Sequence, residues 1–402
     1  MYESVSTYDN VPKDLARAVS LYQEACDSGF SKGCHRLGKC YQDGEGVAKD
    51  LTRAASRRIP MSIVESGILV APESARTESS QQMALPQPSM RVAATQVVKL
   101  CYTLVHAAEA VGIRDLADGE YLPTDATLEE GIERQLNYLL DQVGCNRRGF
   151  RLLEIGCGYG HLLRLAKARG ARAVGVNLSP EQVGYCNDHG LQAYCCNYRD
   201  LFDATQWHGQ FDGVIANGSL EHWVQPEDVQ AGRMNPIYHE SFAIAYKALD
   251  PGAYDARYVT TAIHVTRDVK PEYLLTPWYR QPRGSDRRHF SLLHSWMGGY
   301  YPVDGQLEEC AGPYFSLETE VDGTLGYEIA NDYRMARMVR GLYTNPKLVW
   351  RIARSLVRHP RVTGSMIECF FVEKSWDWQF QGEDPPMKLL RHTWRRNSLA
   401  HT

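Results

Sequence analysis

Short apolar runs alternate with amphipathic stretches through the middle of the chain. Leu152, Leu153 and Ile155 form an apolar run of strand length, and residues 161–167 behind it carry leucines on one helical face. The same alternation continues further along the chain. Strands are predicted at 171–178, 192–196, 211–217 and 258–265, and helices at 180–188 and 237–249. Because strands that alternate with helices form a parallel sheet, the pattern predicts a doubly wound α/β fold.

Two helices are predicted before this alternation and one strand after it. The first helix begins near Val92 and ends near Gly112, and the second has Thr127 as its N-cap and ends at Gly144. A late apolar run at 366–374 is predicted to be a strand. The α/β domain is therefore expected to span residues 93–402.

The first sixty residues contain a repeated segment. Residues 11–18 recur at 47–54, an offset of 47 − 11 = 36 residues, with small residues between them. A period in the mid-thirties predicts a helix-turn-helix repeat. The pattern resembles a Sel1-like repeat in residues 1–60, which implies a protein partner, and the Pro-, Ser- and Gln-rich residues 61–92 are predicted to be a linker. Cys26 and Cys34 are interpreted as packed thiols, with a disulfide as the alternative in an exported protein.

Composition narrows the classes of function. The 402 residues carry a net charge of −4, which gives no electrostatic case for binding nucleic acid. No apolar run reaches the roughly 18 residues of a membrane span, and the N-terminal residues lack a signal-peptide pattern. Eleven cysteines without such a signal favour reduced thiols. We therefore expect a cytoplasmic protein.

The turn after the first strand carries the main candidate chemistry. Gly156, Gly158 and Gly160 stand at alternate positions, and Glu154 precedes them. Glycines let the backbone turn sharply and approach a ligand, with a helix N-terminus beside it. The spacing G-x-G-x-G differs from the G-x-G-x-x-G of dinucleotide-binding loops. A glycine-rich turn in an unrelated α/β protein is the alternative.

The order E-x-G-x-G-x-G resembles motif I of the class I S-adenosylmethionine (SAM) methyltransferases. The resemblance implies a Rossmann-like sheet of seven strands, in which the last strand inserts antiparallel. It also implies SAM as cofactor, with the glycine loop against its methionine part and Glu154 helping to place both.

Three later segments resemble one subfamily, the cyclopropane fatty acid synthases and mycolic acid methyltransferases. Residues 175–182 are close to its G-V-T-L-S-x-x-Q, residues 197–201 to its D-Y-R-D-L, and residues 217–222 to its G-x-F-E-H. Asn replaces the expected residue at positions 177 and 197, and its amide can still form hydrogen bonds with a ribose or an adenine. The resemblance implies that these segments also bind SAM. The expected contacts are Asn177, Leu178, Gln182, Asn197, Tyr198, Asn217 and Gly218.

The same resemblance implies methyl transfer to an alkene of a lipid acyl chain, by cyclopropanation or plain C-methylation. The carbocation that results must lose a proton, and in the family a bicarbonate, held by a Glu, a His, a Tyr and backbone near a Cys, accepts it. Glu221, His264 and Tyr327 match the three side chains, and Gly119 stands near the place of the Cys. A glutamate beside bicarbonate is expected to have a raised pKa. Each of the three is otherwise an ordinary buried polar residue, and no metal is expected.

Several segments leave alternatives open. The aromatic-rich residues 278–301 suit either a lipid tunnel or plain core, and the insertions at 224–236 and 255–257 suit a substrate other than an acyl chain. A basic cluster, Arg280, Arg283, Arg287, Arg288 and His289, is either a solvated loop or an attractor of anionic headgroups. A second basic run, 351–361, lies on a helix that suits peripheral contact with a membrane. Two other functions compete with lipid methylation: methylation of another small molecule or natural-product intermediate, and an interaction protein with a vestigial methyltransferase domain. The intact glycine loop and Gln182 argue against the second of these.

Overall fold

The computed structural model describes residues 96–122, 126–197, 200–201, 203, 205–253, 255–382 and 384–397, and before them residues 19–20, 23, 37, 40–41 and 47–49. The chain divides into two compact units, Met1–Met83 with Tyr121–Thr127, and Ala84–Glu120 with Leu128–Thr402. In the first unit, Leu37 and Tyr41 are buried and pack against Val19 and Val47. The expected linker and most of the expected repeat, with Cys26 and Cys34, lie outside the described residues.

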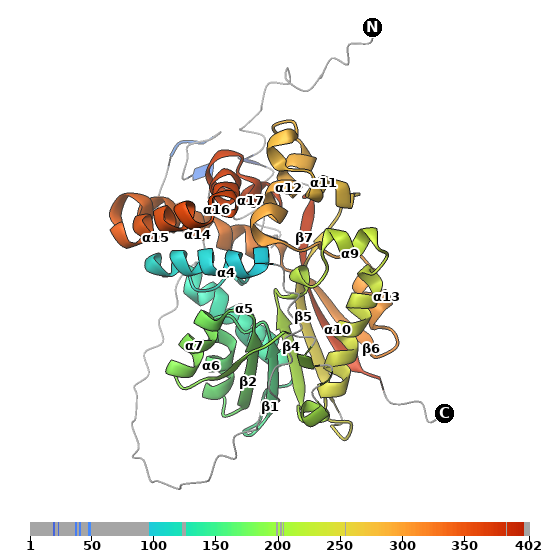
Figure 1. The fold of residues 1–402 in the computed structure, drawn as a ribbon. Coiled ribbons are helices and arrows are strands. Elements are labelled where there is room, and N and C mark those ends of the chain that lie inside the picture. The colour runs from blue at the N-terminus through green and yellow to red at the C-terminus, as the bar shows by residue number, and fades with distance from the viewer. Residues whose placement is uncertain are drawn as a thin grey trace, which may run out of the picture. The chain divides into compact units, whose positions relative to one another are not determined.

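The second unit is built on a seven-stranded sheet with the strand order β3-β2-β1-β4-β5-β7-β6 (Figure 1). The first five strands pair in parallel, and β7 inserts antiparallel between β5 and β6. The predicted doubly wound, seven-stranded sheet is confirmed. The strands are β1 Arg151–Ile155, β2 Arg172–Asn177, β3 Gln192–Cys195, β4 Gly213–Asn217, β5 Arg257–Val265, β6 Phe315–Asp322 and β7 Met387–Arg396.

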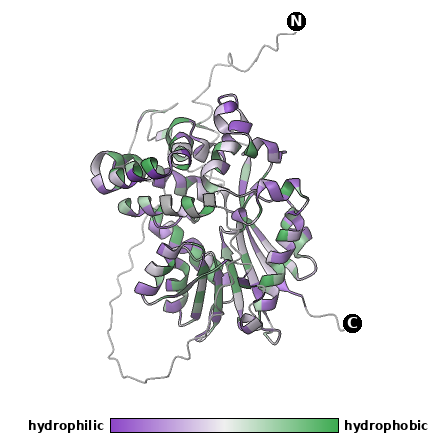
Figure 2. Ribbon diagram, viewed as in Figure 1, coloured by the Kyte–Doolittle hydropathy of each residue, from purple (hydrophilic) through white to green (hydrophobic). Residues whose placement is uncertain are grey.

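Helices flank this sheet, and Figure 1 shows α14 to α17 gathered with α4 beyond one end of it. Figure 2 shows the central strands mostly in the hydrophobic colour, as expected of strands that helices cover on both faces. The α-helices are α4 Gln96–Ala108, α5 Leu128–Gln142, α6 His161–Ala168, α7 Pro180–Asp188, α9 Pro226–Gln230, α10 Met234–Ala248, α11 Pro271–Leu275, α12 Asp286–Met297, α13 Gln306–Ala311, α14 Thr324–Thr344, α15 Pro346–Arg358, α16 Pro360–Ile367 and α17 Ser375–Trp378. Shorter helical turns are η1 Glu109–Val111, η2 Thr205–Trp207, η3 Leu220–His222, η4 Trp278–Arg280 and the π-helical η5 Glu368–Val372.

The predicted elements up to β5 agree with the structure to within a few residues. Helix α7 has the predicted bounds because Ser179 accepts a hydrogen bond from the backbone N–H of Gln182, as an N-cap does, and Pro180 follows it. The first helix is α4, continued by η1, and Gly112 ends it in the left-handed conformation. These boundaries depend on local capping chemistry, which the sequence displays directly.

The predicted strand at 366–374 is wrong. Those residues form the end of α16 and the π-helical turn η5, in which Met366 and Cys369 are buried three positions apart. That spacing is helical, and a short apolar run does not by itself distinguish a strand from a buried helix. The inserted last strand is instead β7, a segment rich in Arg and His that carries no continuous apolar run.

The basic cluster at 280–289 is only partly solvated, because Arg280, Arg283 and Arg287 are exposed and its other two residues are not. Arg288 and His289 lie in α12 and are buried. The Arg288 guanidinium pairs with Glu368 at 2.8 Å and with Glu373 at 2.7 Å. This charge therefore helps to fasten α12 to the α16–η5 segment, and it is not available to a lipid headgroup.

Among the residues that the structure describes, no helix has both the length and the apolar character needed to cross a membrane.

Candidate active site

The glycine loop between β1 and α6 forms one wall of a cavity at the carboxyl ends of the parallel strands. Gly156, Gly158 and Gly160 all have positive φ angles, of 88°, 51° and 71°. A Cβ on Gly156 would lie 2.7 Å from the Cβ of Ser219, and one on Gly160 would lie 2.6 Å from Leu191, whereas one on Gly158 would meet no atom within 4 Å. Gly156 and Gly160 are thus required for packing, and Gly158 leaves open the space in front of the loop.

The cavity spans about 870 Å³, including space that opens to solvent, and draws its lining from distant parts of the second unit. The loop contributes Glu154, Gly156 and Gly158, and the opposite side comes from helices α4 and α14 and from the ends of β4 and β5. Predicted site residues that line it are Glu154, Gly156, Gly158, Gln182, Asn217, Gly218, Glu221 and Tyr327. The sequence prediction had named these residues from separate motifs, and the fold brings them to one space.

Glu221 is held with one carboxylate oxygen engaged and the other free. It lies in η3 directly after β4, and only 3% of it is exposed. Its Oε1 accepts a hydrogen bond from the backbone N–H of Ile263 at 2.9 Å, and Oε2 has no hydrogen-bond partner among the described residues. Burial raises the pKa of Glu221 to about 7, and the backbone N–H groups only partly oppose this. A carboxylate in this state can accept a proton near neutral pH.

Gly299 packs against the turn that carries Glu221. Gly299 has a φ of 85°, and a Cβ built on it would overlap the carbonyl oxygen of Glu221. The backbone N–H of Gly299 also donates a hydrogen bond to Gln225 at 3.1 Å. The segment after α12 therefore packs directly against the η3 turn, and only glycine permits that approach.

Tyr327 reaches the cavity from α14. The ring is buried and packs edge-on against Phe380, with ring centroids 4.7 Å apart. Burial raises the pKa of its hydroxyl above the ordinary value. At neutral pH this hydroxyl therefore remains a neutral hydrogen-bond donor in the same cavity as Glu221.

His264 does not line this cavity. Glu221, His264 and Tyr327 were expected to meet at one site, and the structure brings only Glu221 and Tyr327 together there. Thr261 and Ile263 of β5 line the cavity, and His264, on the alternate face of the strand, does not. Its imidazole lies against that of His392, with ring centroids 5.5 Å apart. Burial, followed by the effect of His392, lowers the pKa of His264 to about 4.

The residues expected to hold bicarbonate do not fit that ion. His264 faces the other side of the sheet, as just described. Gly119 packs its carbonyl oxygen against Gly326 of α14, and the same oxygen accepts a hydrogen bond from Arg391 at 3.4 Å. Glu221 and Tyr327 alone remain at the cavity, so the four-group anion site is not assembled.

A smaller cavity continues the first at the end of β2. Tyr102, Gly156 and His222 line both cavities, so the two adjoin. The smaller one is lined by the predicted residues Asn177, Leu178 and Asn197. The Asn177 amide donates a hydrogen bond to Gln182 at 2.7 Å, which connects the two sides of the expected ribose site. Tyr198 lies outside the described residues.

Sequence reasoning missed several residues that line the site, among them Tyr102, His222, Thr261 and Asp118. Tyr102 and His222 pack edge to face between the two cavities, with ring centroids 5.7 Å apart. Thr261 donates a hydrogen bond to Asn217 at 2.7 Å and thereby fixes the end of β4. Asp118, paired with Arg391, lines the cavity beside Tyr327. Tyr102, Thr261 and Asp118 carry no recognised motif, so no signal in the sequence identifies them. His222 belongs to the Glu-His pair, of which only Glu221 was predicted to be a site residue.

Comparison with known proteins agrees with this geometry. Residues 125–295 match a family model described as a methyltransferase domain, and residues 7–30 and 31–56 match the Sel1 repeat. A protein of Mycobacterium tuberculosis named "Probable fatty acid methyltransferase" is 33% identical over 106 residues, which cover 24% of this chain and 23% of that protein. The cyclopropane-fatty-acyl-phospholipid synthase of Escherichia coli is 25% identical over 197 residues, 48% of this chain and 42% of the synthase. The matches thus span less than half the length of these two relatives.

A solved structure extends the comparison to three quarters of this chain. The cyclopropane synthase MmaA2 of Mycobacterium tuberculosis has a TM-score of 0.56 against this chain at 16% identity. The match covers 75% of this chain and 97% of that structure. At this level of identity the likeness establishes a shared fold.

Proposed function

We propose, from the premise that residues 125–295 form a SAM-dependent methyltransferase domain, that this domain methylates an alkene carbon of a lipid acyl chain. The product is either a methyl-branched or a cyclopropane-containing chain. The observation that carries the proposal is the buried Glu221 carboxylate, whose Oε2 has no partner among the described residues. It lines the same cavity as the glycine loop and Tyr327.

The residues at the glycine loop fit SAM. The Oε2 atom of Glu154 is buried and has no hydrogen-bond partner in the described part of the chain, and burial raises the pKa of this group. Gly158 leaves space where a ligand can meet backbone. SAM would be held by Glu154 and the loop at its methionine end and by Asn177, Gln182 and Asn197 at its adenosine end. When bound, it supplies an electrophilic methyl group.

The chemistry then needs a base and a dry pocket. The two π electrons of the alkene form the new bond to the methyl carbon as the sulfur–carbon bond breaks, and the second alkene carbon becomes a cation. Loss of a proton to the Glu221 carboxylate neutralises that cation and gives either an alkene or, if the proton comes from the new methyl group, a ring. Tyr327 and Tyr102 place aromatic side chains at this cavity, and such rings stabilise positive charge.

An apolar chamber supports an acyl chain as the substrate. About 600 Å³ of space lies among α4, α14, α15, α16 and η5, and the chamber shares Val105 and Leu116 with the active-site cavity. Its lining is apolar apart from Arg334, whose guanidinium is engaged by the carbonyl oxygen of Asp115 at 3.1 Å and by Asn331 at 3.2 Å. Met335 and Met338 are side chains that adapt to irregular apolar partners. This apolar lining supports a hydrocarbon tail as the group that occupies the chamber.

Helix α15 supports delivery of that chain from a membrane surface. It packs inward through the buried Leu348, and Ile352 lines the apolar chamber. On its outer side Trp350 is 68% exposed and Val357 is 84% exposed, with the exposed Arg354 between them. Exposed aromatic and apolar residues interleaved with arginine are typical of a helix that lies in the interface of an anionic bilayer.

A vesicle experiment tests this surface. Binding to phosphatidylglycerol vesicles should exceed binding to phosphatidylcholine vesicles, and the double change Trp350→Ala and Val357→Asp should reduce it. Tyr279→Ala, which removes an aromatic residue that is 64% exposed on η4, is the matched control. Equal binding by all three proteins would exclude α15 as the membrane-facing helix.

A second candidate function is methylation of a more polar small molecule. Arg114, Asp115 and His161 also line the active-site cavity, and His161 lies 3.6 Å from Asp115. Charged groups at the lining favour a substrate that carries a polar group. The Sel1-matching residues 7–56 support a protein partner in either case.

Lipid analysis tests the main proposal. Cells that express the protein and are fed methionine with a trideuterated methyl group should accumulate acyl chains that carry one added, deuterium-labelled carbon. Three retained deuterium atoms indicate a methyl branch, and two indicate a ring or a methylene group. Glu221→Gln should lower turnover about 10²–10⁴-fold with little change in SAM affinity. Glu309→Gln, at an exposed position of α13, is the control. Unlabelled lipids, with label instead in a polar metabolite, would favour the second candidate.

A further inference from the structure

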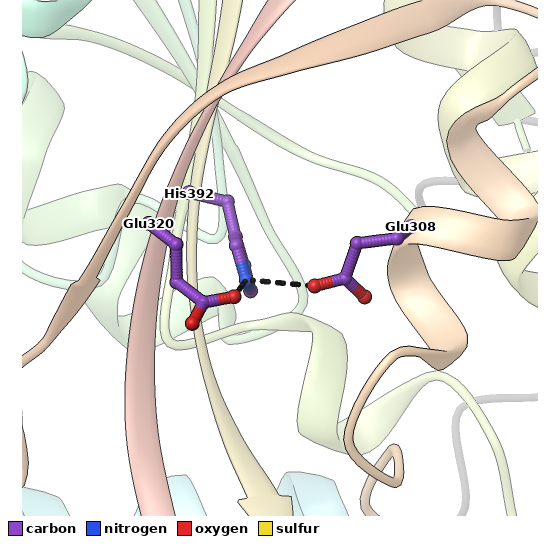
Figure 3. Close-up of side chains that lie close together, drawn as sticks. All are labelled: Glu308, Glu320 and His392. Carbon is purple, nitrogen blue, oxygen red and sulfur yellow. Dashed lines mark hydrogen bonds and ion pairs between the residues drawn. The ribbon is translucent and has the colours of Figure 1, made fainter.

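A cluster of two carboxylates and an imidazole joins α13, β6 and β7 (Figure 3), and none of its three residues lines the active-site cavity. His392 of β7 and Glu320 of β6 are directly paired across the two strands, and Glu308 approaches them from α13. The Nε2 atom of His392 lies 3.2 Å from Glu320 and 3.4 Å from Glu308. One ligand atom from each residue lies within 4.8 Å of the others.

Hydrogen bonds among these three residues do not satisfy them. The Nε2 atom can offer one proton at most, and two carboxylates compete for it. The His392 ring is fully buried, its Nδ1 has no partner among the described residues, and neither does Oε2 of Glu308. Two negative charges this close together repel each other in a partly buried site, and a cation between them would remove that repulsion.

The distances suit a metal ion. Zinc bonds of about 2.0–2.1 Å to nitrogen and oxygen, arranged tetrahedrally, place neighbouring ligand atoms about 3.3–3.4 Å apart. The two separations from His392 Nε2, 3.2 Å and 3.4 Å, are close to that spacing. The Glu320 side chain is 45% exposed, which leaves a path for an ion to enter from solvent.

The His264 ring packs beside His392, with ring centroids 5.5 Å apart, and it is not one of the three clustered ligands. Its Nδ1 lies 3.0 Å from the carbonyl oxygen of Ala262. A carbonyl oxygen can only accept, so Nδ1 carries the proton and Nε2 of the neutral ring carries a lone pair. Only 1% of His264 is exposed, and its Nε2 has no partner in the described part of the chain.

We propose that Glu308, Glu320 and His392 bind a divalent transition-metal ion, with Zn²⁺ as the best match to their donor atoms. The donor set of imidazole and carboxylate excludes a soft, thiolate-type site. Because α13, β6 and β7 each contribute one ligand, the ion fastens the outer helix to the last two strands of the sheet. This site is separate from methyl transfer and stands whether or not the proposed function is correct.

Metal binding by the full chain tests the proposal directly. Protein stripped with a chelator should bind one Zn²⁺ per chain at this site in calorimetry, and Zn²⁺ should raise its melting temperature because a ligand that binds only the folded state stabilises it. Co²⁺ in the same site should show d–d absorption without a thiolate charge-transfer band. A thiolate band would show that the ion binds cysteines and would overturn the proposal. A melting temperature that Zn²⁺ does not raise would overturn it as well, because the folded protein would then hold no ion.

Matched variants identify the ligands. Glu308→Gln and Glu320→Gln keep the shape of partly exposed side chains and should each remove the Zn²⁺-dependent rise in melting temperature. Glu309→Gln, the exposed neighbour of Glu308 on α13, should keep it. Unchanged affinity in both glutamine variants would show that the cluster is only hydrogen-bonded.

Discussion

The Glu221 carboxylate and the Ile263 backbone join the ends of two neighbouring strands, because Oε1 of Glu221 accepts the Ile263 N–H at 2.9 Å. This bond fixes the carboxylate at the cavity and leaves Oε2 uncommitted. The bond engages backbone of β5, so the identity of the side chain at position 263 is not what holds the glutamate. The position of the base is thus set by the pairing of β4 with β5.

The activity should depend on pH through Glu221. Its pKa of about 7 means that the basic form increases as pH rises through neutrality. Turnover at saturating SAM should therefore rise between about pH 6 and pH 8, and the Glu221→Gln variant should lose this dependence along with most of its activity. A wild-type rate that stays constant over this range would contradict a base with this pKa.

The stability should also depend on pH through Glu221, in the opposite direction. The folded pKa of about 7 lies above the ordinary value of 4.5, so the folded state holds more protons between these values. Stability is then lost as pH rises from 4.5 to about 7 and is level above that, by about 3 kcal/mol for this group. Urea unfolding at pH 5 and pH 8 should show this loss in the wild type relative to Glu221→Gln. Parallel losses in both proteins would assign the effect to other groups.

Two glycines of the loop should respond differently to the same change. Gly158→Ala places a methyl group in the open cavity, so SAM binding should be lost while the free energy of unfolding falls by only about 1–2 kcal/mol for the left-handed backbone. Gly160→Ala adds overlap with Leu191 at 2.6 Å and with Cys186 at 2.9 Å, and should cost about 1–3 kcal/mol more. Calorimetry with SAM and urea unfolding measure the two effects. Full SAM affinity in Gly158→Ala would exclude the loop as the binding surface.

Arg391 should be essential for stability because it neutralises a buried acid. Only 3% of Arg391 is exposed, and its Nε donates to Asp118 at 2.7 Å while Nη1 pairs with Glu120 at 2.6 Å. Arg391→Met should destabilise the protein by about 3–5 kcal/mol, the usual cost of leaving a buried charge without its partner.

A double variant separates the effect of the unpaired Asp118 charge from the effect of the packing that Arg391→Met removes. Asp118→Asn combined with Arg391→Met should recover part of the loss, because no buried charge remains. Burial raises the pKa of Asp118 to about 6 even beside Arg391, so the loss in the single variant should be smaller at pH 5 than at pH 8. If the losses of the two single variants simply add in the double variant, and none of them depends on pH, the effect of Arg391→Met comes from packing alone.

Residues 1–83 should be dispensable for SAM binding. Every residue that lines the two cavities lies between Val98 and Leu389, in the second unit. A chain that begins at Ala84 should bind SAM with unchanged affinity in calorimetry and retain turnover. If this truncated chain binds SAM and does not turn over, the N-terminal segment contributes to the substrate site, and the predicted boundary between repeat, linker and enzyme domain needs revision.

The sequence by itself determined the first five strands, the glycine loop and the helix that follows β2. These features depend on interactions between neighbours in the chain: apolar runs of strand length, glycines at alternate positions, and the Ser179 cap before Pro180. Local rules also placed Glu221 directly after a strand that ends at the cavity. These interactions join residues that are close together in the chain, so the sequence predicts them without knowledge of the fold.

Only the tertiary structure decided the last two strands and the face on which each site residue lies. β7 contains the buried polar residues Arg391, His392 and Thr393. They are buried because residues far away in the sequence surround them: Asp118 and Glu320 bind two of them, and strand β5 pairs with β7 along this segment. His264 and Ile263 are adjacent in the chain, yet one faces His392 and the other faces the cavity. Successive residues of a strand point to opposite sides, so a shift of one position changes which site a side chain serves. Whether a polar residue in a strand is catalytic, structural or metal-binding therefore depends on partners that only the folded chain brings together.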